Sequence, residues 1–258
     1  MPYSPLIPGA SLLLASLISC APAPETADEA AAPVQRVIDR AIRVHGMEDF
    51  DNASATFTFR ERDYGIDRAG GDYTYTRTFT DSLGRLIVDK LSNDGLERRI
   101  TGSLVELSPK DSAAYANSVN SVQYFFSLPH GLHDPAVNAT LLDSVRIDGA
   151  LYDRVRITFD QDGGGTDFED VYHYFFDRNS GELDYLAYTF EADGGGIRFR
   201  KAVNQRRIGG VLVQDYINYG LDGDDRDIDN IAARFTRGEL PQLSLIENIA
   251  VRINDTEG

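Results

Sequence analysis

The stretch VYHYFFDRNSGELDYLAYTF, residues 171–190, decides the fold of this chain. Two runs of apolar and aromatic residues flank Arg178-Asn179-Ser180-Gly181, a composition typical of a tight turn between antiparallel strands. Side chains alternate across a strand, so each run has two faces. One face of each run carries Val171, His173, Phe175, Leu183, Tyr185 and Ala187. The opposite face carries Tyr172, Tyr174, Phe176, Leu186, Tyr188 and Phe190.

Both faces of this hairpin are therefore apolar or aromatic. An antiparallel sheet with one face in water carries polar side chains on that face. The sheet must accordingly curl, bury both faces or keep an apolar cleft. Two explanations remain open: either closure of the sheet or a partner covers these faces, or one of them forms a groove for a ligand.

Strand patterns continue on both sides of the hairpin, separated by short turn sequences such as Ser92-Asn93-Asp94-Gly95. With the two strands above, they predict about twelve antiparallel strands in a meander. The further strands are expected near residues 56–59, 73–80, 85–90, 96–101, 104–107, 142–147, 151–159, 197–206, 211–219 and 243–253. In the last of these, Leu243, Leu245, Ile249, Val251 and Ile253 are expected to share one face.

Two helices are predicted among these strands. One begins at Pro33, repeats apolar residues at helical spacing and stops before Gly46. The other begins after Ser108 with Pro109 in its first turn and ends near Leu128-Pro129. Its expected buried face consists of Tyr115, Val119, Val122 and Phe126. The predicted fold is mainly β (α+β), a curled antiparallel half-barrel wrapped around two helices.

An apolar run near the N-terminus ends with Leu17-Ile18-Ser19-Cys20, which contains the only cysteine of the sequence. This stretch resembles a bacterial lipobox, in which the cysteine is acylated after the preceding peptide is removed; the alternative is a buried core cysteine. We expect a signal peptide at 1–19, a lipidated flexible tether at 20–32 and a single domain at 33–258. Ala21 resembles the sorting signal for the outer membrane, so we expect a periplasm-facing lipoprotein anchored there.

The charge balance limits the partners of this chain. It has 41 acidic against 25 basic residues and a net charge of −16. This excess disfavours nucleic acid and anionic lipid surfaces as direct partners. Contact with a membrane is therefore expected through the lipid anchor.

Few residues suggest chemistry. His130, His133 and Asp134 lie in one short loop, where they could bind a metal ion or simply form hydrogen bonds. The run from Asp160 to Gly165 resembles a calcium loop but lacks the glutamate that would complete it, and the acidic run from Asp222 to Asp229 reads as a solvated loop. No nucleophile elbow, phosphate-binding loop or dinucleotide fingerprint is present. We predict neither a cofactor nor a bound metal.

Arginines on one predicted strand offer a different kind of site. Arg198 and Arg200 share a face with Asn204 and could receive an anionic group at the mouth of a groove. The alternative is pairing with Asp or Glu on a neighbouring strand. Asp215 lies in phase with Val213 and Ile217, so its carboxylate needs a partner such as arginine if it is buried.

Three segments carry a family resemblance: YFFSLPHGLHDPAV (124–137), GGGTDFEDVYHYFFDRNSGELDYLAYTF (163–190) and GGGIRFRKAVNQRRIGGVLVQDYINY (194–219). They resemble an uncharacterised family of secreted bacterial lipoproteins. Its architecture is similar to that of the half-barrel lipoprotein carriers and receptors, the class of LolA and LolB. The resemblance implies a lipid or lipoprotein ligand; it is one of architecture and assigns no residue a role.

The leading hypothesis is an envelope lipoprotein that binds a hydrophobic or lipidic ligand, such as an acyl chain or a lipoprotein, without catalysis. One alternative is an envelope hydrolase with its site around His130, His133 and Asp134. Another is a protein-interaction module with no small ligand. The expected lipidation site is Cys20, and the expected ligand-binding residues are Tyr124, Tyr172, Tyr174, Tyr188, Arg198 and Arg200.

Overall fold

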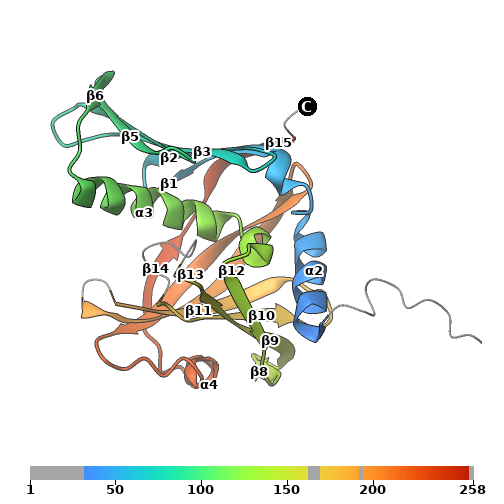
Figure 1. The fold of residues 1–258 in the computed structure, drawn as a ribbon. Coiled ribbons are helices and arrows are strands. Elements are labelled where there is room, and N and C mark those ends of the chain that lie inside the picture. Colours follow the sequence, from blue (N-terminus) through green and yellow to red (C-terminus); the bar gives the residue numbers. More distant parts are fainter. Residues whose placement is uncertain (1–31, 162–168, 192–193, 256–258) are drawn as a thin grey trace, which may run out of the picture. The chain divides into compact units, whose positions relative to one another are not determined.

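A computed structural model describes residues 32–161, 169–191 and 194–255. Within the unit formed by residues 32–258, the strands make two antiparallel sheets (Figure 1). In spatial order, sheet A contains β15 (Ile249–Asp255), β1 (Ala53–Phe59), β2 (Arg62–Ala69), β3 (Asp72–Thr80), β4 (Leu86–Ser92), β5 (Gly95–Ile100) and β6 (Ser103–Val105). Sheet B contains β14 (Gln242–Ile246), β13 (Val211–Asp222), β12 (Gly196–Ile208), β11 (Leu183–Phe190), β10 (Tyr172–Asp177), β9 (Ala150–Phe159) and β7 (Val137–Leu141), with β8 (Val145–Ile147) also paired to β9.

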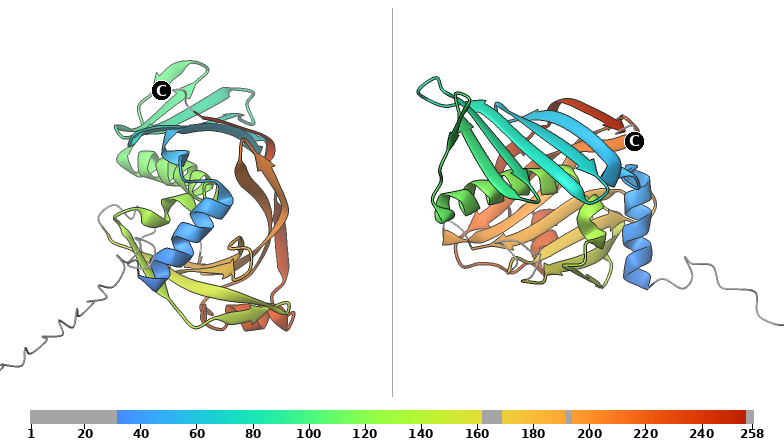
Figure 2. Two further views of the ribbon diagram at one scale, coloured as in Figure 1. Left: turned by 90° about the vertical axis from the view of Figure 1, so that its right-hand side faces the viewer. Right: turned by 45° about the horizontal axis from the view of Figure 1, so that its top comes forward.

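The helical elements are α2 (Pro33–His45), α3 (Pro109–Phe126), α4 (Ile231–Thr236) and the 3-10 turns η1 (Phe50–Asn52) and η2 (His130–His133). The two sheets curve around α3, and α2 packs at one side of them (Figure 2). The sheets are separate and do not close into a barrel. The mainly β, half-barrel fold expected from the sequence is therefore confirmed.

The described residues contain more strands than the sequence pattern predicted. The additional strands include β2 and β7. In β2 only Tyr64 and Ile66 are buried, and Arg62, Asp63 and Asp67 are exposed, so the strand is hidden in a polar stretch of sequence. Strand β7 follows directly on the loop that contains His130, and most of it lies between that loop and the strand expected near residues 142–147.

The expectation of one strand from Leu243 to Ile253 was wrong. The chain changes sheets within this stretch: β14 ends at Ile246 and pairs with β13, while β15 begins at Ile249 and pairs with β1. At the change, the Asn248 amide donates to Asp215 Oδ1 at 2.9 Å, and its side chain donates to the Gln214 carbonyl at 3.2 Å. These buried bonds turn the chain, so Leu245 and Ile249 remain exposed while Ile253 is buried.

Both predicted helices are confirmed. Helix α2 buries Ile38, Ala41 and Ile42 and ends at Gly46, which has a positive φ of 69°. A side chain at this position would also collide with the Gly210 carbonyl in the β12–β13 turn. Both the positive φ and this close contact therefore require glycine. Helix α3 begins as expected, because the Ser108 hydroxyl accepts the Asp111 amide at 3.1 Å.

The two faces of sheet B belong to different cores. The inner face, with Tyr174, Phe176 and Leu186, packs with α2, α3 and sheet A. The outer face buries Phe175, Tyr185 and Phe199 with Ile231 and Phe235 of α4. The ring centroids of Phe199 and Phe235 lie 4.6 Å apart. This short helix, which the sequence pattern did not predict, covers the second apolar face.

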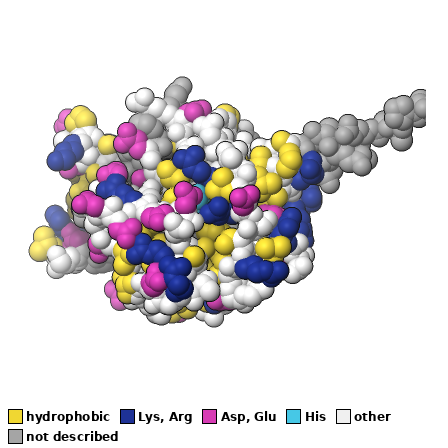
Figure 3. Space-filling model, turned by 90° about the horizontal axis from the view of Figure 1, so that it is seen from below, with side chains coloured by type: hydrophobic (Ala, Val, Ile, Leu, Met, Phe, Trp, Pro, Cys, Tyr) yellow, Lys and Arg dark blue, Asp and Glu magenta, His cyan; other side chains and the backbone are white. Residues whose placement is uncertain are grey.

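The surface on the side of α4 and β8 carries basic and acidic side chains interspersed with apolar ones (Figure 3). No described helix is both long enough and apolar enough to span a bilayer.

Candidate functional site

A cleft of about 490 Å³ lies between α3 and the inner face of sheet B. From α3 it is lined by Asn117, Ser121, Val122, Phe125 and Phe126, and from the end of β1 by Phe59. The wall contributed by sheet B includes Tyr172, Tyr188, Phe190, Tyr216 and Asn218. Aromatic side chains from elements far apart in the sequence therefore face one another across open space.

Helix α3 is held in place by sheet A. Arg77 donates to the Ser118 hydroxyl at 2.7 Å, and Arg98 lies 3.4 Å from the centre of the Tyr115 ring. Both arginines bond Asp89, which is completely buried. A paired, hydrogen-bonded ion cluster of this kind costs several kcal/mol when one partner is removed. It fixes α3 to sheet A and leaves its other side facing the cleft.

The expected buried stripe of α3 is thereby divided between two surroundings. Tyr115 and Val119 face sheet A, and Phe126 stacks on Phe57 of β1 with ring centroids 4.0 Å apart. Val122 and Phe126 also line the cleft. Gln123 is more buried than most of the predicted stripe, with 2% exposure, and it donates to the Gly65 carbonyl.

The four tyrosines expected to bind a ligand occupy two layers. Tyr172 and Tyr188 line the cleft, stacked with ring centroids 5.5 Å apart. Tyr124 and Tyr174 are not part of the lining; their hydroxyl oxygens lie 2.5 Å apart in a hydrogen bond. Burial raises the pKa of both hydroxyl groups, so the pair is neutral at physiological pH. These two residues support the wall from behind.

Arg198 and Arg200 both line the cleft. Arg198 pairs with Asp222 at 2.7 Å and donates to the carbonyls of Ile197 and Leu221. The pairing with a neighbouring strand that the sequence left open is therefore realised for Arg198, because Asp222 belongs to β13. Arg200 donates to the Tyr188 hydroxyl at 2.9 Å and lies 3.9 Å from the centre of the Phe125 ring.

Of the six expected ligand-binding residues, Tyr172, Tyr188, Arg198 and Arg200 line the cleft. The lining residues that the sequence did not predict include Phe125, Tyr216 and Asn218. Phe125 falls outside the apolar stripe of α3 that faces sheet A. Tyr216 and Asn218 alternate in phase on β13, and Asn218 is the cross-strand partner of Arg200. Their alternation was the available signal, but it could not show which face of the strand was left uncovered.

The buried carboxylate of Asp215 has the partner that its burial required. Arg206 approaches it at 3.3 Å, and Asn204 donates to it at 3.2 Å. The strand bulges at this point, with Asn204 at a φ of 52°, so Asn204 does not continue the face of Arg198 and Arg200. This cluster joins β12 to the segment where the chain changes sheets.

The histidine loop does not converge on one point. His130 Nε2 lies 3.1 Å from both Asp51 and Arg68, whereas His133 Nε2 lies 2.8 Å from Asp39. Burial, together with the charge of Arg68, lowers the pKa of His130. Neither histidine lines the cleft. The convergence with a third ligand that would favour the hydrolase alternative is absent among the described residues, which also contain no metal-binding group of three His, Cys, Asp or Glu.

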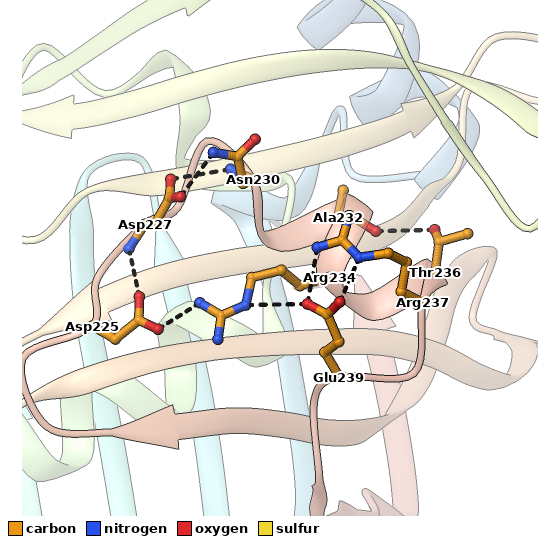
Figure 4. Close-up of polar contacts among 8 residues, drawn as sticks. All are labelled: Asp225, Asp227, Asn230, Ala232, Arg234, Thr236, Arg237 and Glu239. Atoms are coloured by element: carbon orange, nitrogen blue, oxygen red, sulfur yellow. Dashed lines mark hydrogen bonds and ion pairs between the residues drawn. The ribbon is translucent and has the colours of Figure 1, made fainter.

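The two acidic runs have separate outcomes. Most of the calcium-like run, at 162–165, lies outside the described residues. In the second run Asp225 binds Arg234 at 2.7 Å, and Asp227 accepts from the Asn230 side chain at 2.8 Å (Figure 4). Arg234 and Arg237 both bind Glu239 near α4. These pairs fasten the segment that covers the outer face of sheet B.

A family model matches residues 12–248. The chain belongs to the family of unknown function DUF6503. The expected membership of an uncharacterised family is therefore confirmed. A search of curated proteins finds no match.

Solved structures with similar folds include a DUF1329 family protein from Desulfovibrio piger, with 11% identity, 86% of this chain and 93% of that chain covered, and a TM-score of 0.52. A LolA superfamily protein from Nitrosomonas europaea has 11% identity, coverage of 87% and 95%, and a TM-score of 0.48. A putative outer membrane lipoprotein-sorting protein domain from Vibrio parahaemolyticus has 6% identity, coverage of 86% and 93%, and a TM-score of 0.47. At such low identity the first of these shows a shared fold alone.

Proposed function

We propose that this protein binds a hydrophobic or lipidic ligand in the cleft between α3 and sheet B, without converting it chemically. The supporting observation is the cleft of about 490 Å³ with aromatic walls. Its volume falls in the range of small-molecule sites, roughly 300–1,000 Å³. Each methylene moved from water into such surroundings contributes about 0.8 kcal/mol. Apolar burial alone can therefore supply the affinity.

In this proposal the ligand contacts Tyr172 and Tyr188 along its apolar part and Arg198 or Arg200 at its polar end. Tyr124 and Tyr174 act indirectly, because their mutual hydrogen bond fixes the wall on which Tyr172 lies. The edge-to-face contact of Tyr124 with Tyr172, at 6.1 Å between centroids, supports this role.

The test of ligand binding uses the full-length chain with Cys20→Ser, so that an acyl group attached to the protein itself cannot enter the cleft. We expect lipid to copurify in native mass spectrometry and a fluorescent fatty acid to bind. Ser121→Trp should fill the cleft and weaken this binding at least about 10-fold. The matched control is Asn120→Trp, the neighbouring exposed position on the same helix, which should bind like the parent. Absence of both copurified lipid and fluorescent binding would refute the proposal.

We further propose that residues 1–19 are a signal peptide, that Cys20 carries a lipid anchor, and that residues 20–32 tether the domain at 33–258 to the outer membrane, facing the periplasm. The sequence Leu17-Ile18-Ser19-Cys20 and the presence of a single thiol support this proposal. Metabolic labelling with a radioactive fatty acid should mark the parent chain and not Cys20→Ser. Label retained by the serine variant would contradict the assignment.

A further inference from the structure

Two neighbouring cations on the inner face of β12 differ in their surroundings. Arg198 is neutralised by Asp222 and held by two backbone carbonyls. For Arg200, no carboxylate lies within ion-pair distance among the described residues. Within the described residues, the Arg200 guanidinium donates a hydrogen bond to the Tyr188 hydroxyl. Among the described residues, Arg200 on the wall of the cleft therefore has no ion-pair partner.

Aromatic rings surround this charge. The guanidinium carbon of Arg200 lies 3.9 Å from the centre of the Phe125 ring and 5.2 Å from that of Tyr188. Its Nε is buried and has no hydrogen-bond partner within the described ranges. Arginine in such a setting presents a planar set of N–H donors that matches a carboxylate or phosphate. The rings fix the plane of the guanidinium, so little freedom is lost when an anion binds.

A second polar group lies beside Arg200. Asn218 is its cross-strand partner on β13 and also lines the cleft. The buried end of the Asn218 amide has no partner among the described residues. A half-turn of the amide exchanges its oxygen and nitrogen, so this end can donate a hydrogen bond to an anion next to Arg200. Arg200 and Asn218, at paired positions on neighbouring strands, therefore each keep a polar atom without a partner beside the cleft.

Three of the described acidic residues line the cleft: Glu169, Asp170 and Glu191. Glu191 pairs with Arg226, and the buried Asp170 has an interaction of its own. Glu169 is exposed to solvent, where its charge is screened. The net charge of −16 belongs to the whole chain and does not describe the surroundings of Arg200, where the nearest recorded partners are uncharged.

The size of the cleft limits the apolar part of a ligand. If a methylene needs about 30 Å³, the share of one water molecule in the liquid, 490 Å³ holds roughly sixteen carbon atoms. This is enough for one acyl chain of about that length.

We propose that the ligand is a single-chain amphiphile with an anionic oxygen head, whose carboxylate or phosphate binds Arg200 and Asn218 while its chain lies against Tyr172 and Tyr188. The inference rests on the proposed function of the cleft and adds to it the charge of the head and the number of chains.

The experiment compares three probes of equal chain length on the full-length Cys20→Ser protein: palmitate, hexadecyl phosphate and hexadecanol. At least one anion should bind about 10-fold or more tightly than the alcohol, because hydrogen bonds to charged groups are the strong ones. Arg200→Gln should weaken the binding of that anion about 10- to 100-fold and change hexadecanol binding less than about threefold. Tighter binding of palmitate would identify a carboxylate head group, and tighter binding of hexadecyl phosphate would identify a phosphate head group.

The matched control is Lys201→Gln on the same strand. It removes the same charge, but its ammonium binds Asp148 at 3.0 Å and lies outside the cleft lining. It should leave the preference for the anion unchanged. Equal binding of alcohol and anions, or equal losses of both in Arg200→Gln, would overturn the anionic head while leaving an apolar site. Failure of all three probes to bind would instead refute the proposed function itself.

Discussion

The two faces of sheet B are built from the same strands and have similar aromatic content, yet they differ in how they are covered. On the outer face, Phe199 packs against Phe235 of α4 and is completely buried. On the inner face, α3 approaches but is fixed to sheet A through Asp89 and its two arginines. Helix α4 packs on the outer face itself, whereas α3 is fixed to the opposite sheet and touches the inner face through Tyr124 and Phe125. A cleft remains beside α3 on the inner face.

The polar groups of the two faces differ in where they lie. Near α4, Asp225 is paired with Arg234 and Glu239 with Arg237 (Figure 4). Both faces keep buried polar atoms without hydrogen-bond partners among the described residues, such as His173 Nδ1 on the outer face and Arg200 Nε on the inner face. Of these two side chains, Arg200 lines the cleft and His173 does not. The comparison indicates a structural role for the outer face and leaves the inner face for the ligand recognition that we propose.

The largest effect on stability is expected at the centre of the outer face. Phe199→Ala should lower the free energy of unfolding by about 3–5 kcal/mol, because it removes a fully buried ring from contact with Phe235 and Tyr185. Denaturant unfolding followed by circular dichroism measures the change. Phe190→Ala, on the less buried inner face, is the control and should cost clearly less. Equal losses would show that the wall of the cleft at Phe190 is packed as tightly as the outer face and would break the comparison.

The attachment of α3 to sheet A can be tested next. Phe126→Ala should cost about 3 kcal/mol, since it removes the stacked contact with Phe57 at 4.0 Å. The exposed Asn120 on the same helix supplies the control Asn120→Ala, which should change stability by less than about 0.5 kcal/mol. If both variants show the same small shift in denaturation midpoint, the buried side of α3 has been assigned wrongly.

A pH dependence follows from His173, which lies on the outer face and is completely buried. Burial, together with the charge of Arg154, lowers its pKa from 6.5 to about 4. Between these pH values the unfolded chain binds the proton and the folded protein does not, so the free energy of unfolding falls as the pH drops. Protonation of this histidine in the unfolded chain lowers the free energy of unfolding by about 2 kcal/mol at pH 5, and this loss vanishes above pH 6.5.

His173→Phe measures this loss, because phenylalanine has a similar shape and no proton to bind. Its free energy of unfolding should decrease less between pH 7.5 and pH 5 than that of the parent protein. His45, whose pKa is also lowered to about 4, remains in both proteins and contributes equally. An identical pH-dependent decrease in both proteins would show that His173 is accessible to protons in the folded state.

The smallest effect is expected from the charge balance of the inner face. Asp222→Asn releases Arg198 from its ion pair and places a second available cation on the cleft wall. Palmitate should then bind about two- to fivefold more tightly, and stability should hardly change, because Asp222 is 77% exposed and such surface pairs contribute little. Fluorescence competition measures this change. Weaker binding of palmitate in this variant would indicate that Asp222 positions Arg198 for the ligand.

Much of the architecture follows from local sequence patterns. The caps at Ser108 and Gly46 placed both long helices correctly, because capping depends on residues within one turn. The alternation in 171–190 correctly indicated that both faces of the hairpin are apolar. The same patterns did not place β2, and they joined β14 and β15 into one strand, because that break depends on hydrogen bonds from Asn248 to the distant residues Asp215 and Gln214.

The candidate site divides along the same line. The sequence alone indicated that Tyr172 and Tyr188 lie on aromatic strand faces and that Arg198 and Arg200 share one face of a later strand, since side chains alternate along a strand. Only the tertiary structure decided that α4 covers one face, while α3 is fixed to sheet A and leaves a cleft beside the other. It also decided that Asp222 neutralises Arg198 while Arg200 meets Phe125 and Asn218. Strand periodicity is local, whereas the covering of a face and the pairing of a charge depend on segments that only folding brings together.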